Sequence, residues 1–447
     1  MKEHKRFKMS QTQFIAYGFM IIILAGTLLL MTPWASRDGK SIGFLSALFT
    51  ATSASCVTGL VVADTYRQWT VFGQLVILTM IQIGGLGFIT IGVFVSIVLR
   101  RKIGLKERGL MQESANTLQI GGVVKLARKI IVGTAIFEGG GAVLLALRFI
   151  PEFGLVKGIY YGIFHSISAF CNAGFDLMGG PEAYSSFVRY YDDWIINIVI
   201  MALIIIGGIG FIVWDDIQKN GLKFQKYLLH TKIVLIATFV LIFGSAFLFY
   251  LFEKDNLIAG MSPTGQFLAS MFSSVTARTA GFNTVDTGKL SHASKLLTII
   301  LMFIGGSPGS TAGGVKTTTL VVLMLYVRAN IQRSYGVNVF DRRLEDDAIK
   351  HAGAVVTINM GLAMIACLVI MGVQSSDMSD VLFEAFSAIG TVGMSTGFTR
   401  SLLPVSRIMI ILLMYCGRIG SLSFALAFTQ QKKIAHVQQP KEQIRIG

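Results

Sequence analysis

Cysteine is scarce in this chain, and no two cysteines are spaced to hold a metal together. The sequence has four cysteines in 447 residues, mostly in apolar surroundings, and none belongs to a C-x-x-C motif. Disulfide frameworks and zinc sites both require cysteines at characteristic spacings. The sequence therefore indicates neither a disulfide-stabilised domain nor a cysteine metal centre. The four are Cys56, Cys171, Cys367 and Cys416.

Charge is also scarce, since only 14% of the residues are charged whereas 53% are hydrophobic. Apolar stretches long enough to cross a bilayer, which takes about 20 residues, recur along the whole chain. They lie near residues 12–34, 70–99, 126–149, 193–214, 231–252, 295–325, 352–372 and 403–429. We therefore expect an all-α polytopic membrane protein with eight transmembrane helices. The first stretch lacks a convincing cleavage site and is followed by more spans, which argues against a signal peptide.

Acidic residues are fewer than basic ones. The chain has 24 Asp and Glu residues against 39 Lys and Arg residues, which gives a net charge of +15. The distribution of this excess indicates membrane topology rather than nucleic-acid binding. Basic clusters fall at every second connection between the apolar stretches, which is the positive-inside pattern. We therefore predict a multi-pass protein of the cell membrane with both termini and three long loops in the cytoplasm, and no nucleic-acid partner. The clusters lie at residues 1–8, 100–108, 125–129, 219–232 and 328–350, and from Lys432 onward.

Four short segments between successive apolar stretches resemble one another. They are FTATSASCVTGL (49–60), FHSISAFCNAGF (164–175), MFSSVTARTAGF (271–282) and FEAFSAIGTVGM (383–394). Aligned without gaps, each has glycine at its eleventh position, and three of the four have serine six residues earlier. The chain is therefore predicted to consist of four tandem units, each reading span, short pore helix, turn, span. The predicted units are residues 1–115, 116–225, 226–345 (with a broken second span) and 346–447, the last including a cytosolic tail.

The four short segments are expected to form re-entrant pore loops around a central axis, because they are too short to cross a bilayer. Backbone carbonyls in a ring can replace the hydration shell of a monovalent cation. A glycine in each turn allows a carbonyl to point at the axis in a conformation that other residues disfavour. The predicted ion-binding residues, acting through their carbonyls, are Val57, Thr58, Gly59, Leu60, Asn172, Ala173, Gly174, Phe175, Thr279, Ala280, Gly281, Phe282, Thr391, Val392, Gly393 and Met394.

Three aspartates follow the turns on the outward side of the predicted pore. Asp64, Asp176 and Asp286 could concentrate cations at its outer mouth. Aspartate is equally common in ordinary loops, and the sequence does not separate these two roles.

With these turns, the chain resembles the Trk/Ktr/HKT superfamily of potassium transporters, and most closely the membrane subunit of bacterial Ktr systems. The resemblance covers essentially the whole chain, including one filter glycine in each unit. It implies potassium as the transported ion, because plant relatives that prefer sodium have serine where this chain has Gly59. It also implies a homodimer that sits on a cytosolic octameric RCK (KTN) ring. That ring, which binds an ATP- or ADP-type nucleotide, would be a separate polypeptide, because no G-x-G-x-x-G follows a strand here; no cofactor is expected in this chain.

The second apolar stretch of each unit carries a glycine cluster. The clusters are QIGGLGF (82–88), IIGGIGF (205–211), FIGGSPG (303–309) and YCGRIGS (415–421). In the first two, close helix packing explains the glycines as well as lining of an inner pore does. The third contains proline and further glycines, which prevent a regular helix. The fourth places Arg418 inside an apolar helix, where a charge needs acceptors such as the carbonyls of the broken segment.

In the family that the chain resembles, a flexible loop in the third unit gates the pore, and a basic residue of the fourth unit lies near it. The resemblance implies a gate at residues 305–314 that moves aside when the ring changes nucleotide. Arg418 could instead anchor its helix without a gating role, and Lys316 could simply extend toward the cytoplasm. The predicted gate residues are Gly305, Gly306, Ser307, Pro308, Gly309, Ser310, Thr311, Ala312, Gly313, Gly314, Lys316 and Arg418.

Other functions fit the same residues less well. A nucleotide-binding loop fails because Val315 separates Gly314 from Lys316, whereas the Walker A motif has glycine directly before lysine. An enzyme would need paired carboxylates or a nucleophile converging at one depth, and no such set recurs. A sodium-coupled potassium symporter, or a less selective Na/K transporter on the same fold, stays open.

Overall fold

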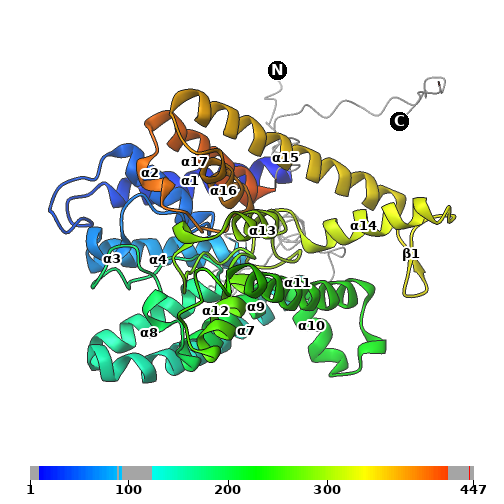
Figure 1. Ribbon diagram of the computed structural model, residues 1–447, viewed down its shortest axis with the longest axis horizontal. Coiled ribbons are helices and arrows are strands. Elements are labelled where there is room, and N and C mark those ends of the chain that lie inside the picture. The colour runs from blue at the N-terminus through cyan, green and yellow to red at the C-terminus, as the bar shows by residue number, and fades with distance from the viewer. Residues whose placement is uncertain (1–9, 88–89, 93–122, 421–441, 443–447) are drawn as a thin grey trace, which may run out of the picture.

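The computed structural model describes residues 10–87, 90–92, 123–420 and 442, and within them the chain is mostly helical (Figure 1). Its one sheet among these residues is an antiparallel hairpin of two short strands, β1 (Asn338–Val339) and β2 (Arg342–Arg343). The predicted basic clusters at 1–8 and 100–108 and nearly all of the tail from Lys432 lie outside the described residues, as do the ends of the stretches 70–99 and 403–429.

The helices repeat in four sets along the chain. Each set has a long first helix, a shorter helix that ends just before a glycine turn, and a second apolar helix. The long first helices are α1 (Gln11–Leu30), α7 (Val123–Phe153), α11 (Leu229–Glu253) and α15 (Asp346–Val373). The short helices are α2 (Phe44–Ser55), α8 (Leu155–Phe170), α12 (Pro263–Thr276) and α16 (Met378–Gly390). The second helices are α4 (Val71–Leu86), α9 (Trp194–Gly208), α13 (His292–Phe303) and α17 (Pro404–Ile419).

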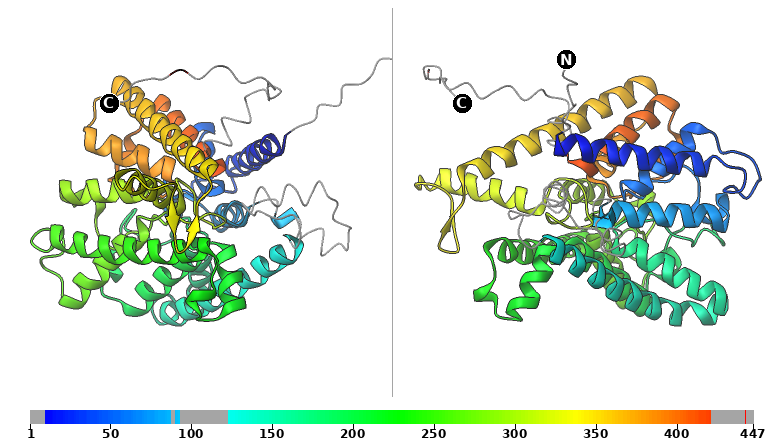
Figure 2. Two further views of the ribbon diagram at one scale, coloured as in Figure 1. Left: turned by 90° about the vertical axis from the view of Figure 1, so that its right-hand side faces the viewer. Right: turned by 180° about the vertical axis from the view of Figure 1, so that it is seen from behind.

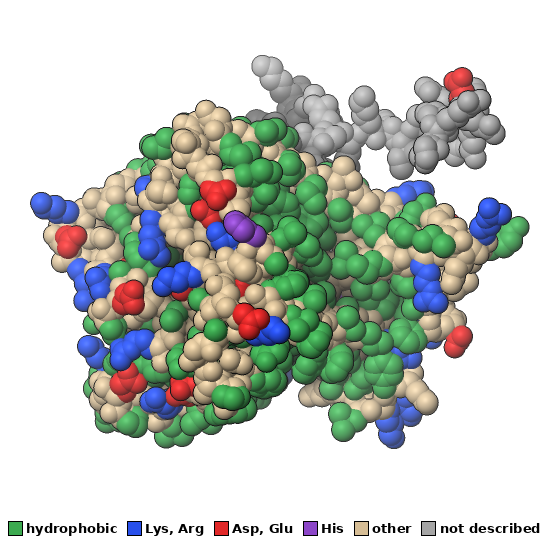
Figure 3. Space-filling view, viewed as in Figure 1, with side chains coloured by type: hydrophobic (Ala, Val, Ile, Leu, Met, Phe, Trp, Pro, Cys, Tyr) green, Lys and Arg blue, Asp and Glu red, His purple; other side chains and the backbone are tan. Residues whose placement is uncertain are grey.

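The apolar helices mark a multi-pass membrane protein. Among the described residues, α1, α7, α11 and α15 are long and apolar enough to cross a membrane. A fifth span would be formed by α9 together with α10 (Phe211–Asn220). Hydrophobic side chains gather over the middle of the face in Figure 3, with Lys and Arg toward its two sides. The total of eight spans stays a prediction.

The second helix of the second set is sharply bent, which the sequence analysis missed. Residues 193–214 were expected to form one continuous span, but α9 ends at Gly208 and α10 leaves at an angle of 95°. Gly210 has a φ of 98° at this bend, a conformation that glycine adopts without steric cost. The bend was missed because the sequence analysis explained the glycines of the cluster at 205–211 by close packing or pore lining.

The second helix of the third set is interrupted, as the sequence predicted. It ends at Phe303, and the chain resumes helical structure only at α14 (Thr317–Ile331). The intervening residues 304–316, which we call the intramembrane loop, lie among the other elements near the centre of the molecule (Figure 1).

Short elements complete the connections and distinguish two ends of the molecule. The hairpin and α10 lie together at one end, the hairpin end, whereas α3 and the start of α8 lie at the other, the α3 end (Figures 1 and 2). The short helices are α3 (Thr65–Gln68), η1 (Val188–Tyr190), η2 (Phe224–Lys226), η3 (Thr287–Lys289) and η4 (Phe398–Ser401).

Candidate functional site

Each of the four short helices leads into a turn with two left-handed residues. The glycines Gly59, Gly174, Gly281 and Gly393 have φ values of 92°, 67°, 81° and 91°. The residues two places earlier are also left-handed, namely Val57, Asn172, Thr279 and Thr391, with φ values of 56°, 58°, 77° and 51°. Left-handed residues at alternate positions let successive carbonyls point to the same side, whereas an extended strand points them alternately. Such turns can therefore line one axis with oxygen atoms.

The four turns contact one another in a closed cycle. A Cβ atom placed on Gly59 would lie 2.5 Å from the carbonyl oxygen of Ala173, and one on Gly174 would lie 2.5 Å from that of Ala280. A Cβ on the third glycine would overlap the Val392 carbonyl, and one on the fourth would overlap the Thr58 carbonyl of the first turn. The ring thus closes on itself in chain order, and any side chain at these four glycines would push the neighbouring turn away.

A hydroxyl from each short helix supports the turn that follows. In the first turn Ser53 Oγ accepts a hydrogen bond from the Gly59 amide at 3.1 Å, and the fourth turn repeats this bond with Ser387. In the second turn, Ser168 Oγ donates to the carbonyl of Phe175 at 2.7 Å. These are the serines that the sequence comparison singled out.

The third turn obtains its hydroxyl from Thr276, which donates to the Phe282 carbonyl at 2.7 Å. The ungapped alignment paired Val275 with the serines, and this is wrong by one residue. The backbone hydrogen bonds show the same offset. In the third turn the Ala280 amide donates to the carbonyl five positions before Gly281. In the other turns the amide of the residue before the glycine donates to the carbonyl six positions before that glycine. The third turn is therefore one residue shorter than the others.

The glycine clusters of the second helices let these helices pack closely on the ends of the short helices. A Cβ on Gly84 would overlap the carbonyl of Ser55, one on Gly207 that of Phe170, and one on Gly417 that of Ile389. Close packing is therefore a sufficient reason for the first two clusters, as the sequence analysis allowed.

The intramembrane loop is closed on itself and bonded to the second repeat. Its ends meet where the Gly305 amide donates to the Val315 carbonyl at 2.8 Å. The amides of Ser307 and Thr311 donate to the carbonyls of Gly208 and Gly207, at 3.0 and 3.2 Å. The loop is thus held at the bend between α9 and α10.

The same loop also contacts one face of the ring of turns. A Cβ on Gly313 would overlap the Thr391 side chain, and one on Gly314 would lie 3.0 Å from the Gly390 carbonyl. Thr391 is one of the left-handed residues of the fourth turn. The loop therefore lies directly against the ring on the side that faces the hairpin end.

Two basic side chains hold this loop. Lys316 Nζ donates to the carbonyls of Ala312 and Gly313 at 2.7 and 3.3 Å, so it folds back onto the loop instead of extending away. Arg418 donates to the Thr311 carbonyl of the loop and to the Gly84 carbonyl of α4. It also donates to the Gly85 carbonyl at 3.1 Å.

Arg418 therefore joins the first repeat, the loop of the third and the fourth repeat, and loop carbonyls are among its acceptors, as the sequence led us to expect. On the side of the hairpin end, a cavity of about 270 Å³ is lined by the loop together with residues of α1, α4 and α17. Gly85, Gly309, Lys316 and Arg418 are among its lining residues.

A second cavity, of about 70 Å³, lies on the other side of the ring and is lined by all four turn glycines. We call it the vestibule. Asp64 and Asp176 both line it, but Asp286 does not. The guanidinium of Arg400, which the sequence analysis did not single out, also lines it and lies 3.8 Å from the ring centre of Tyr184.

The three predicted mouth aspartates differ in what they bind. Asp64 accepts hydrogen bonds from the backbone amides of Tyr66, Arg67 and Tyr184 at 2.7–2.9 Å, so its carboxylate is largely used in holding loops. Asp286 caps the N-terminus of η3 and forms an ion pair with Lys289. The Asp176 carboxylate accepts a hydrogen bond from one backbone amide, that of Met178. It is half-buried in the vestibule wall, and loss of solvent around the carboxylate raises its pKa to about 7.

A chain with these features is an α-helical membrane protein with a pseudo-fourfold ring of backbone turns, and sequence comparison identifies its family. The family model described as TrkH, cation transport protein, matches residues 2–437. The chain therefore belongs to the TrkH family of cation transport proteins, which is not a family of enzymes.

Individual relatives agree with this assignment. The chain is 40% identical to the potassium/sodium uptake protein NtpJ of Enterococcus hirae, over 100% of this chain and 99% of that one. It is 38% identical to the Ktr system potassium uptake protein B of Bacillus subtilis, over 97% and 96% of the two chains. The crystal structure of the potassium transporter TrkH from Vibrio parahaemolyticus has the same fold, with a TM-score of 0.75 at 18% identity, over 96% of this chain and 87% of that one.

Proposed function

We propose that this chain takes up potassium across the cell membrane through a pore along the axis of the four glycine turns. The observation that carries the proposal is the closed ring, in which each turn contacts the next and left-handed residues alternate. In this proposal the carbonyls of residues 57–60, 172–175, 279–282 and 391–394 replace the water around a dehydrated ion. The names of two relatives, both uptake proteins for potassium, support potassium as the ion.

The proposed architecture has eight membrane spans and four re-entrant pore loops. In this proposal the four long first helices supply four of the spans, and the shorter second helices supply the other four. The hairpin end faces the cytoplasm and so do both termini. Basic residues along 219–232 and 328–350 lie at that end, in keeping with the positive-inside rule.

The intramembrane loop is the proposed gate. It lies between the ring and the inner cavity, so an ion leaving the filter on this side meets Gly313 and the charges of Lys316 and Arg418. Opening requires the loop to leave its backbone partners on the second repeat. One of these bonds joins the Phe211 amide of α10 to the Gly309 carbonyl at 2.7 Å. A movement of α10 at the cytoplasmic end would therefore be transmitted to the loop.

The names of the Ktr relatives, which are proteins of an uptake system, support a role as one component of a larger system. In this proposal the chain is the membrane component and forms a homodimer. A separate cytosolic octameric RCK ring binds an ATP- or ADP-type nucleotide and controls the loop. The chain itself needs no cofactor, because potassium is its cargo.

A second candidate is a sodium-coupled or less selective Na/K transporter on the same fold. It is favoured by the relative from Enterococcus hirae, whose name includes both ions. Rubidium uptake separates the two functions. Uptake that stops when sodium is removed indicates coupling, whereas uptake that depends only on the membrane potential indicates a channel-like pore, because about 100 mV supplies roughly 2.3 kcal/mol per charge.

The proposal is tested by potassium-limited growth of a bacterium that lacks its own potassium uptake. The full chain is expressed alone and together with a candidate ring subunit. We expect growth to be restored in at least the second case. Failure in both cases, with the chain present in the membrane, would contradict the proposal.

A further inference from the structure

A short segment of the second repeat lies over the vestibule. Residues 184–187, which we call the strap, follow the second turn and lead into η1. Tyr184 and Ser186 both line the vestibule, and both have a left-handed backbone, with φ values of 61° and 45°. The strap is therefore neither helix nor strand, and its two bends direct it across the cavity.

The strap is hydrogen-bonded to the first and third repeats. The Tyr184 amide donates to the Asp64 carboxylate of the first repeat at 2.7 Å. The Phe187 amide donates to the Asn283 carbonyl of the third repeat at 2.8 Å, and the Asn283 amide donates to Ser186 Oγ at 3.2 Å. The strap is thus fixed to two repeats that lie opposite each other in the ring, because the turns contact in chain order.

The strap also reaches the fourth repeat, which lies opposite its own. The Arg400 guanidinium lies 3.8 Å from the centre of the Tyr184 ring. Both residues line a cavity that is also lined by the glycines of all four turns. Side chains from opposite repeats that touch in such a cavity meet over the axis of the ring. The stacked pair therefore covers the outer entrance.

Arg400 belongs to η4, which is fixed to the short helix of the fourth repeat. Glu384 of α16 accepts hydrogen bonds from Ser395 Oγ at 2.8 Å and from the Thr399 hydroxyl. Both Glu384 and Thr399 are buried, whereas Arg400 itself is exposed. The backbone of η4 and the ring of Tyr184 thus determine together where the guanidinium lies.

The charge of Arg400 opposes the entry of cations. Asp64 and Asp176 line the same vestibule and attract cations, but Arg400 forms no ion pair with an acid among the described residues. Its positive charge therefore offsets part of their field at the place where an external ion arrives. Stacking on an aromatic face holds a guanidinium without neutralising it.

We propose that Arg400, held over the mouth by Tyr184, occupies the outermost cation position of the vestibule and thereby sets the affinity for the external ion. This inference rests on the proposed pore. An arriving cation displaces the guanidinium before it reaches the glycine ring. Tyr184 is a positioning residue, because it acts through Arg400.

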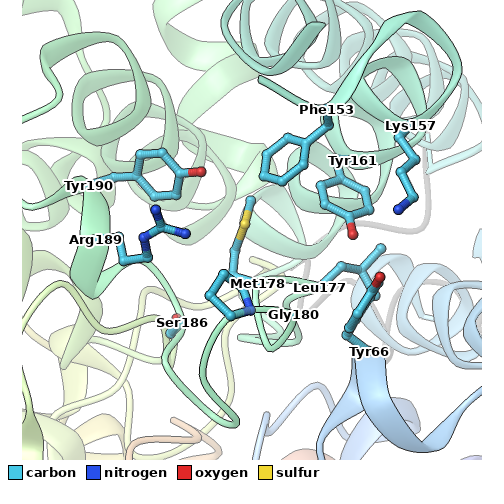
Figure 4. A pocket seen from close by; sticks show the side chains of 11 residues that line it. Tyr66, Phe153, Lys157, Tyr161, Leu177, Met178, Gly180, Ser186, Arg189 and Tyr190 are labelled. Atoms are coloured by element: carbon cyan, nitrogen blue, oxygen red, sulfur yellow. The ribbon is translucent and has the colours of Figure 1, made fainter. Parts of the chain in front are cut away.

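The test is rubidium uptake by cells that express the full chain, measured against the external rubidium concentration. Arg400→Gln is expected to lower the half-saturating concentration by about three- to tenfold, because it removes a positive charge beside the entering ion at a partly screened site. Arg400→Lys keeps the charge and should not lower it. The control is Arg189→Gln, since Arg189 is exposed and lines a neighbouring pocket (Figure 4) but not the vestibule.

Tyr184 variants test whether the two side chains act as a unit. Tyr184→Phe keeps the aromatic face and should behave as the unaltered chain. Tyr184→Leu should lower the half-saturating concentration, but should have no further effect in Arg400→Gln. If Tyr184 only supports the strap, its effect will instead add to that of Arg400→Gln.

Added guanidinium ion tests whether the side chain occupies a cation position. It should inhibit uptake by Arg400→Ala, whose position is vacant, at a lower concentration than it inhibits the unaltered chain. Equal inhibition of both would overturn the proposal. So would an unchanged half-saturating concentration in Arg400→Gln that is present normally in the membrane. Failure of the pore itself is a different result, in which the unaltered chain takes up no rubidium.

Discussion

Arg418 offers the sharpest test of the proposed gate. Of its three hydrogen bonds, one goes to the loop, at Thr311, and two go to α4, at Gly84 and Gly85. Only the first holds the loop itself. A hydrogen bond from a charged donor contributes about 1.5–3 kcal/mol, so its loss should shift the ratio of closed to open loop by about 10- to 100-fold. Arg418→Gln is therefore expected to raise ion flux by that factor when the ring subunit is absent.

A charge-conserving variant distinguishes a latch from an electrostatic barrier. Arg418→Lys keeps the positive charge in the pore, but a single ammonium on a flexible stem cannot reproduce the fork that reaches the loop and α4 together. If Arg418 is a latch, both variants raise flux. If it only repels cations, Arg418→Gln alone raises flux and Arg418→Lys does not.

The assay is rubidium uptake into vesicles, normalised to the amount of chain in the membrane. Arg407→Gln is the matched control, because Arg407 lies on the same helix but donates to the Leu402 carbonyl and to Ser46, not to the loop. Unchanged or lower flux in normally expressed Arg418→Gln would refute the reasoning.

Three further predictions concern the loop, the filter and the vestibule. Deleting residues 306–314 should raise rubidium flux above that of the intact chain, and a normally expressed deletion with unchanged or reduced flux would remove the loop as the gate. Gly59→Ser should lower the preference for potassium over sodium, measured by competition for rubidium uptake. Its control is Gly39→Ser, since Gly39 also has a positive φ but has open space around it. Uptake from dilute potassium should fall as the external pH drops below about 7, because Asp176, whose pKa is raised to about 7, then loses its negative charge. Asp176→Asn should abolish this pH dependence while Asp286→Asn leaves it intact, and a persisting dependence in the first variant would assign it to another group.

The four glycines of the ring could be recognised from the sequence because their physical requirement is unusual. Only glycine accepts both a left-handed conformation and a carbonyl 2.5 Å from the position of its missing Cβ, as at Gly59. The fourfold spacing made this requirement visible. The other left-handed residues of the ring, which lie two places before the glycines, could not be recognised from the sequence. Val57, Thr279 and Thr391 are β-branched, which normally excludes a positive φ, and such strain costs about 1–3 kcal/mol each.

The contacts between repeats also could not be predicted from the sequence. It indicated that Arg418 needs acceptors, but only the fold brings Gly84 and Thr311 to the same guanidinium. The bend at Gly210 was missed because close packing or pore lining already explained the glycines around it. The one-residue offset of the third turn was missed because a threonine replaces the serine there. The boundaries of the four units stay predictions, since the described residues omit the connection between the first two.

The most direct test of the central claim is ion flux into liposomes that contain only the purified chain. The intact chain and the deletion of residues 306–314 are compared, with potassium or sodium as the sole permeant cation. The account predicts potassium flux that follows the membrane potential, needs no sodium, exceeds sodium flux and increases in the deletion variant. No flux above that of empty liposomes in either variant, or potassium flux that occurs only when sodium is present, would contradict it.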